Sequence, residues 1–344
     1  MSVLALRVGP VSTRVPARAL AVSIVAAVLV AVGIAWSISV GVFPIPFTDV
    51  VGELTGLRRS ADSTFIIRRL RLPRALTAAL VGGAFGMSGQ VFQRMVRNPL
   101  ASPDILGVSA GAAVGAVAWI VLRDGSGPTV TFVALAGSIL TVLAIYLLAL
   151  KKGMSSYRLV LIGIGVTAML NAVVAYLLTR AELFDAQRAT IWLTGSVNNR
   201  GWSHVRPLAA ALAVLVPVTL VNARPLRALE LGDDTARGLG VPGRSPLVLA
   251  VSAAALAAVA TAAAGPVGFV ALVSPQIARR LVGPGPAALV PAGLVGAAIV
   301  VYADTLSRLV FSPIELPVGV VTAAVGAPYL LWLLVRSNRI GSGG

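Results

Sequence analysis

The side chains that could do chemistry in this sequence are few, and most of them lie within apolar segments. Gln90 and Gln93 follow a run of glycines in a segment that is otherwise apolar. A buried amide without hydrogen-bond partners is costly in lipid, so each glutamine either bonds a neighbouring helix or faces a wet cavity. Asp304 and Arg308 are four residues apart on one helical face, which suits either a structural ion pair or a functional charge in the membrane. The sequence alone leaves both alternatives open for each pair.

The sequence lacks the residue patterns of most catalytic and metal sites. It has no cysteine and one histidine, His204, so a thiolate metal site is excluded and an imidazole metal centre is disfavoured. It contains no GxxxxGKS or GxxxxGKT phosphate-binding loop, no nucleophile motif and no paired catalytic carboxylates in a plausible cleft. A proton-coupled carrier would need carboxylates or histidines within its spans, and these are nearly absent. We therefore predict no catalytic residue, no metal, no cofactor bound by this chain, and an energy source outside it.

Composition predicts an all-α polytopic membrane protein. Of the 344 residues, 57% are hydrophobic and 12% are charged, and the mean hydropathy is +0.92. Soluble domains are about 45–50% apolar and about 25% charged. The apolar excess leaves no room for a large soluble domain, so residues 1–344 are expected to form a single membrane domain. The net charge of +16 first suggests nucleic acid, but the arginines lie in short gaps between apolar runs, so no nucleic-acid partner is expected.

Hydrophobic runs predict about ten membrane-spanning helices, since about 20 apolar residues cross the hydrocarbon layer. A further apolar piece at 189–197 is expected to form an interfacial or re-entrant helix, so the count can change by one or two. The first run is longer than the apolar core of a signal peptide, about 7–15 residues, which favours a retained span over a cleaved signal. The predicted spans cover residues 19–41, 73–93, 105–122, 129–150, 158–179, 206–222, 246–264, 267–283, 287–309 and 317–335.

An even number of spans places both termini on one side of the membrane. The segments on that side carry more Lys and Arg than the opposite ones, a modest bias that favours cytoplasmic N- and C-termini. Residues 1–18 would then form a cytoplasmic arm, and residues 223–245 a cytoplasmic loop. One group of arginines on the outer side opposes this bias and invites a functional interpretation. This outer arginine cluster consists of Arg58, Arg59, Arg68, Arg69, Arg71 and Arg74.

Five strings of residues stand out in order along the chain. They are RLPR at 71–74, NPLASPDILGVSAGA at 98–112, LGDDTARGLGV at 231–241, GPVGFVALVSPQIAR at 265–279, and ADTLSR with ELPVGVVTAAVGAP between 303 and 328. In this order they resemble the permease subunits of the FecCD family, which serve ABC importers of iron–siderophore complexes, haem and cobalamin. The resemblance covers nearly the whole chain, from about residue 68 to residue 335.

The resemblance implies an ABC type II importer permease fold in a bacterial cytoplasmic membrane. Two permease copies, identical or different, would form the pathway between them and work by alternating access. Two ATPase subunits, which bind ATP with Mg²⁺, would dock on the cytoplasmic side, and a substrate-binding protein or lipoprotein on the outer side. The chain itself would be no enzyme. Its expected cargo is a ferric siderophore, with cobalamin or haem as alternatives.

The resemblance also implies roles for single residues. Arg71, Arg74 and Arg308 would meet acidic residues of the binding protein; lipid headgroup contact or local ion pairing is the alternative. The string at 231–241 would be a coupling helix in a cleft of the ATPase, or else a solvated connector. The residues assigned to ATPase coupling are Gly232, Asp233, Ala236 and Gly240, and those assigned to the pathway or its gate are Gln90, Gln93, Asn98, Leu100, Ser155 and Ser156.

The chain departs from the family pattern at two positions. Gln276 stands where the family commonly has histidine, so this protein cannot require a histidine there, and Ala271 stands where glycine is usual. Two other classes of protein remain to be weighed. An ion-coupled secondary carrier is disfavoured by the missing embedded acids and by the acidic inner loop. A purely structural membrane scaffold does not explain spans that are rich in amides and glycines.

Overall fold

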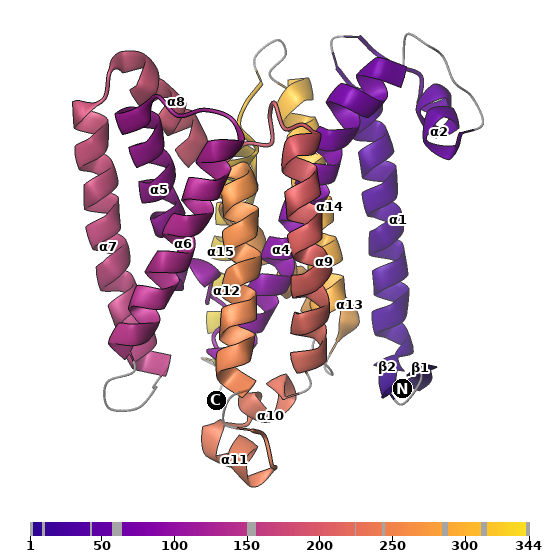
Figure 1. The fold of residues 1–344 in the computed structure, drawn as a ribbon. Coiled ribbons are helices and arrows are strands. Elements are labelled where there is room, and N and C mark those ends of the chain that lie inside the picture. Colours follow the sequence, from indigo (N-terminus) through magenta and orange to yellow (C-terminus); the bar gives the residue numbers. More distant parts are fainter. Residues whose placement is uncertain are drawn as a thin grey trace.

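The structure, a computed structural model, describes residues 3–8, 11–41, 43–56, 64–149, 156–223, 225–242, 245–283, 288–310 and 315–341. These residues form a bundle of helices with one short hairpin at the N-terminus (Figure 1). The hairpin pairs β1 (Val3–Val8) with β2 (Val11–Pro16) in antiparallel register. The arm predicted over residues 1–18 therefore contains two strands, which the sequence analysis did not predict.

The first half of the chain forms the central helix α4 and the helices from α1 to α8 that lie around it. Their bounds are α1 Ala17–Ser39, α2 Phe47–Thr55, the π-helix η1 Ile66–Arg71, α4 Leu72–Met95, the 3₁₀ helix η2 Pro103–Leu106, α5 Val108–Arg123, α6 Pro128–Ala149, α7 Ser156–Arg180 and α8 Leu183–Leu193.

The second half supplies two short helices at one end of the bundle and the remaining long ones. Their bounds are α9 Trp202–Asn222, α10 Leu226–Glu230, α11 Asp233–Gly238, α12 Ser245–Ala264, α13 Val270–Val282, α14 Leu289–Val310 and α15 Val318–Gly341. The loop predicted over 223–245 thus carries α10 and α11.

A helix overlaps each of the ten predicted spans. Among the described residues, seven helices are long and apolar enough to cross a membrane, and two shorter apolar helices lie at Val108–Arg123 and Val318–Trp332. The span predicted over 267–283 holds only α13, whose 13 residues rise about 20 Å, less than the hydrocarbon thickness of about 30 Å. The piece expected at 189–197 overlaps the end of α8.

Helix α4 forms the centre of the bundle, where it packs against α14, α12, α13 and α9. Its glycines allow this close packing. A Cβ added to Gly82 would lie 2.2 Å from the carbonyl oxygen of Gly296, and one added to Gly89 would lie 1.8 Å from that of Ala271. Small residues let membrane helices approach to backbone contact. These glycines are therefore explained by helix packing.

Helix α13 begins at an irregular turn that is packed inside the protein. Phe269 adopts a left-handed backbone conformation with φ 67°, and Gly265 precedes it with φ 76°. A Cβ added to Gly326 of α15 would lie 2.4 Å from the Cβ of Phe269, so only glycine fits at that position. Irregular backbone is tolerated at membrane depth where protein surrounds it, which agrees with this arrangement.

The two ends of the bundle differ in what they carry (Figure 1). Helix α8 lies at one end, and α10, α11 and the N-terminal hairpin lie at the other. Following the orientation predicted from the sequence, we call the α8 end the outer end and the α10–α11 end the inner end. The candidate functional residues gather at these two ends.

Candidate functional site

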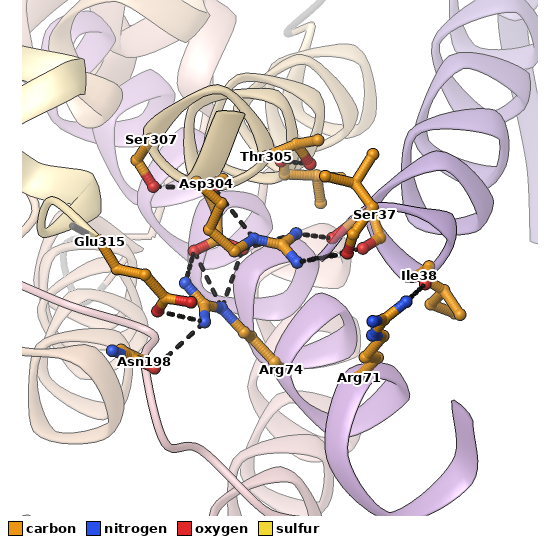
Figure 2. Close-up of polar contacts among 12 residues, drawn as sticks. Ser37, Ile38, Arg71, Arg74, Asn198, Asp304, Thr305, Ser307 and Glu315 are labelled. Atoms are coloured by element: carbon orange, nitrogen blue, oxygen red, sulfur yellow. Dashed lines mark hydrogen bonds and ion pairs between the residues drawn. The ribbon is translucent and has the colours of Figure 1, made fainter. Parts of the chain in front are cut away.

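At the outer end, Arg74 of α4 is the centre of a buried polar network that joins α4 to three other segments (Figure 2). Its guanidinium donates to the Asp304 carboxylate of α14 over 2.8–3.2 Å. It also donates to Glu315 Oε2 at 2.8 Å and to Asn198 Oδ1 at 3.1 Å. The side chains of Arg74 and Asp304 are only 12% and 2% exposed. Because one guanidinium meets two carboxylates, Arg74 is electrically compensated within the chain.

Arg308 and Arg71 connect the end of α1 to this network through hydrogen bonds. Arg308 lies 3.4 Å from Asp304 Oδ2 and donates to the Ser37 hydroxyl at 2.5 Å. The ion pair between residues four apart is therefore formed. Arg71 donates to the carbonyl oxygens of Ile38 and Phe43, each at 2.6 Å (Figure 2 labels the Arg71 and Ile38 side chains). All three arginines predicted to dock a binding protein thus make contacts within the chain, and local pairing accounts for Arg74 and Arg308.

A cavity of about 970 Å³ opens beside this network, and we call it the outer cavity. The end of α1, the η1–α4 junction, the segment 198–204 and the end of α14 surround it. A second cavity of about 560 Å³ adjoins it and shares five lining residues: Asn198, Asn199, Arg200, His204 and Glu315. The charged side chains that line the outer cavity are Arg69, Arg71, Arg74, Arg200, Arg308 and Glu315.

At the inner end, Gln93 connects α4 to α13. Its Nε2 donates to the carbonyl oxygen of Leu272 at 3.0 Å, and its Oε1 accepts from Gln276 Nε2 at 2.9 Å. Arg279 approaches the same oxygen at 3.3 Å. Gln93 and Gln276 are 2% and 6% exposed. Gln93 therefore bonds a neighbouring helix, one of the two alternatives considered for it.

Gln276 also holds the turn that follows α4. Its Nε2 donates to the carbonyl oxygen of Pro99 at 2.7 Å. Within this turn, Asn98 Oδ1 accepts from the backbone N–H of Leu100 at 2.8 Å, and Arg97 adopts a left-handed conformation with φ 55°. Asn98 and Leu100 are exposed at the inner end. Gln276, one of the two positions that depart from the family pattern, thus joins α13 to the turn that follows α4.

The segment of α10 and α11 packs directly beneath α4. Arg94 of α4 forms an ion pair with Glu230 of α10 at 2.9 Å. Leu226 and Leu229 of α10 and Ala236 of α11 are 0–5% exposed and belong to the main core cluster. Gly232 and Gly240 take left-handed conformations with φ 112° and 79°, which bend the backbone before and after α11. Leu231 and Leu239 remain about two-thirds exposed.

The other predicted pathway residues are placed as follows. Gln90 is completely buried in α4, and its amide has no hydrogen-bond partner among the residues that the structure describes. It lines neither of the two outer cavities. Ser155 lies outside the described residues, and Ser156 is the first residue of α7. Asp233 begins α11. No cluster of metal-binding side chains is found in the described part of the chain.

Several residues of these networks were missed from the sequence. Glu315 and Asn198 complete the shell of Arg74, and Arg94 with Glu230 joins α4 to α10. Both Glu315 and Glu230 stood in highlighted strings or next to one, so their charge was a usable signal. Asn198 carried none, because its partner lies 124 residues away in the sequence.

The fold and these contacts define a multi-pass membrane permease. The chain belongs to the FecCD transport family, whose model matches residues 28–336. It is 40% identical over 305 residues to the ferric enterobactin transport system permease protein FepG of Escherichia coli. The aligned residues cover 88% of this chain and 92% of that protein. It is 39% identical over 323 residues to the Fe(3+)-citrate import system permease protein YfmE of Bacillus subtilis, covering 93% and 96%.

One solved structure supports the same assignment, and a second shares the fold. A metal-chelate type ABC transporter in an inward-facing conformation matches with a TM-score of 0.82 and 26% identity, over 92% of this chain and 99% of that one. The PsaBC structure from Streptococcus pneumoniae shares the fold, with a TM-score of 0.54 and 15% identity over 82% and 94% of the chains. The chain is thus a transport subunit of the inner membrane, and ATP hydrolysis belongs to a separate ATPase subunit.

Proposed function

We propose that this chain is the membrane-spanning permease subunit of an ATP-driven importer of ferric siderophores. The observation that carries the proposal is the similarity to FepG, at 40% identity over 88% of the chain. The YfmE relative is also named for a ferric chelate, which favours this cargo over cobalamin or haem. Two permease copies would enclose the cargo between them and expose it alternately to either side of the membrane.

The inner end is the proposed docking site for two ATPase subunits that bind ATP with Mg²⁺. Coupling would run through α11, with Gly232, Asp233, Ala236 and Gly240 shaping it and the exposed Leu231 and Leu239 beside it. Apolar side chains exposed to water on a loop support such a contact, because grouped exposed apolar side chains commonly mark protein–protein interfaces. Movement of α10 would reach α4 through the Arg94–Glu230 pair.

The turn at 98–100 is the proposed cytoplasmic gate, with Asn98 and Leu100 exposed there. Gln93 and Gln276 tie this turn to α4 and α13, which supports a concerted movement of the three. Ser155, Ser156 and Gln90 keep their proposed pathway roles on the resemblance alone. At the outer end, a substrate-binding protein or lipoprotein would dock over Arg71, Arg74 and Arg308.

The proposal is tested by uptake of a radiolabelled ferric siderophore in a bacterial strain that lacks this chain. We expect uptake to be lost in the deletion strain and restored when the chain is supplied together with its ATPase and binding protein. An ATPase variant that cannot hydrolyse ATP serves as the control and should abolish uptake. Undiminished uptake with that variant would contradict the proposal and favour an ion-coupled carrier.

A further inference from the structure

The outer cavity holds more positive charge than its carboxylates compensate. Five arginines line it, and Glu315 is its single lining carboxylate among the described residues. Asp304 adds a second carboxylate just beneath, where Arg74 and Arg308 share it. Arg71 is bonded to uncharged carbonyl oxygens, so its charge is stabilised by dipoles but not neutralised. An uncompensated cationic cavity attracts and concentrates anions.

Among the partly buried arginines of this cavity, Arg200 has the fewest hydrogen-bond acceptors around its guanidinium. Its NH1 group lies 3.2 Å from His204 Nε2. Its Nε is buried and has no hydrogen-bond partner among the described residues. Buried polar groups normally have such partners, so an unused donor at this position needs an explanation. Burial lowers the pKa of the Arg200 guanidinium, but an arginine side chain keeps its positive charge in proteins.

The segment around Arg200 is held in place by its own hydrogen bonds. The indole N–H of Trp202 donates to the Arg68 carbonyl oxygen at 2.8 Å. The backbone N–H of His204 donates to Gly201 at 3.0 Å, and that of Asn199 to Asn198 Oδ1 at 2.8 Å. Arg200 therefore lies between the two cavities on a fixed support, a condition for selective binding.

We propose that Arg200 binds a carboxylate or comparable oxyanion of the cargo as the metal chelate enters the outer cavity. This inference rests on the proposed import of ferric chelates and adds a cargo-binding residue in the permease. The cavity volume of about 970 Å³ favours a small molecule, since pockets for such ligands measure about 300–1,000 Å³. A single acidic side chain from a docked protein would fill only a small part of it. Asn199 and Ser203 add further polar groups to the same wall.

The test uses purified full-length permease in lipid nanodiscs, without ATPase or binding protein, and ferric citrate as the anionic probe. We expect Arg200→Gln to weaken ferric citrate binding on the order of tenfold, the loss of a charged hydrogen bond. Arg200→Lys should retain an intermediate affinity. Arg69→Gln is the matched control, because Arg69 lines the same cavity but is exposed, and it should change the affinity less than about twofold. A neutral ferric trihydroxamate should bind wild type and Arg200→Gln equally.

Two outcomes would overturn the inference. Equal losses for Arg200→Gln and Arg69→Gln would mean that only the overall charge attracts the probe. Unchanged ferric citrate binding by Arg200→Gln, together with weaker binding of the substrate-binding protein, would assign Arg200 to protein docking instead. If Arg200→Gln unfolds at the same temperature as wild type, its loss of binding is not a loss of folding. If its thermal stability is lowered, the affinity of Arg200→Lys makes the distinction instead. The binding assay requires no transport, so a negative result would overturn the role of Arg200 without contradicting siderophore uptake. The uptake experiment tests the proposed function separately.

Discussion

At the scale of single residues, Asp304 is the acidic group that connects the helices at the outer end. Its carboxylate, 2% exposed, accepts from Arg74 of α4 and pairs with Arg308, which in turn holds Ser37 of α1. One acidic group thus joins three helices. A buried charge network of this kind is costly to break, because each remaining charge loses its compensation.

We therefore predict that Asp304→Asn destabilises the permease by about 3–5 kcal/mol, since it leaves two buried guanidiniums facing a neutral amide. The matched control is Glu315→Gln, which removes the other partner of Arg74 at a side chain that is 39% exposed and should cost less than about 1 kcal/mol. Thermal unfolding of both variants in detergent measures the difference. Equal unfolding midpoints for the two variants would show that Asp304 does not hold this end together.

A second prediction concerns Gln276. Replacing it by leucine removes the donor to the Pro99 carbonyl oxygen and to Gln93 Oε1. Each unmade buried hydrogen bond costs about 1–3 kcal/mol, so siderophore uptake should fall about tenfold or more while the ATPase still co-purifies. Gln276→His keeps an N–H donor and should transport nearly as well as wild type. Normal uptake by Gln276→Leu would remove the assigned link between α13 and the gate.

At the scale of elements, α4 is the connection between the two ends. It begins at the outer network beside Arg74 and ends at the inner end with Gln93 and Arg94. Its centre is packed by glycines against α14 and α13, which leaves little space for independent movement of these helices. A displacement of α10 is therefore expected to move α4 and its neighbours together.

The ion pair between Arg94 and Glu230 can be tested by exchanging its charges. Arg94→Glu and Glu230→Arg should each lower the transport-stimulated ATPase rate of the assembled importer by about tenfold, because like charges then meet at the α4–α10 contact. The double variant restores opposite charges and should recover most of the rate. Losses that simply add in the double variant would mean that the pair carries no coupling.

The sequence predicted the helices better than their contacts, for a physical reason. Apolar runs are local, so a helix could be predicted in each of the ten segments, although only seven of the described helices are long and apolar enough to cross a membrane. The Asp304–Arg308 pair was also readable, because its members are one helical turn apart. The bond from Arg74 to Asp304 joins residues 230 positions apart, and that from Gln276 to Gln93 joins residues 183 apart. No periodicity within one sequence indicates pairs so far apart along the chain. Local ion pairing was therefore considered for the arginines only as an alternative to docking a partner protein, and the acceptors of Arg74 on distant segments were missed.

At the scale of the whole molecule, the two ends present different surfaces. The outer end has a cationic cavity with few acids, and the inner end has short helices with exposed leucines. Arginine on an outer surface opposes the usual excess of positive charge on the cytoplasmic side, so the orientation deserves a direct measurement. The chain is suited to this measurement because it contains no cysteine.

We predict that α11 and both termini face the cytoplasm. Phe184 at the outer end and Leu239 beside α11 at the inner end are 78% and 64% exposed, so each accepts a cysteine without disturbing the core. A membrane-impermeant maleimide should label Phe184→Cys in intact spheroplasts, whereas Leu239→Cys should react only after the membrane is permeabilised. The cysteine-free wild type controls for background, and co-expression of the ATPase should protect Leu239→Cys in permeabilised membranes. Labelling of Leu239→Cys in intact spheroplasts would invert the orientation, and with it the assignment of the ATPase to α11 and of the cargo to the cavity beside Arg200.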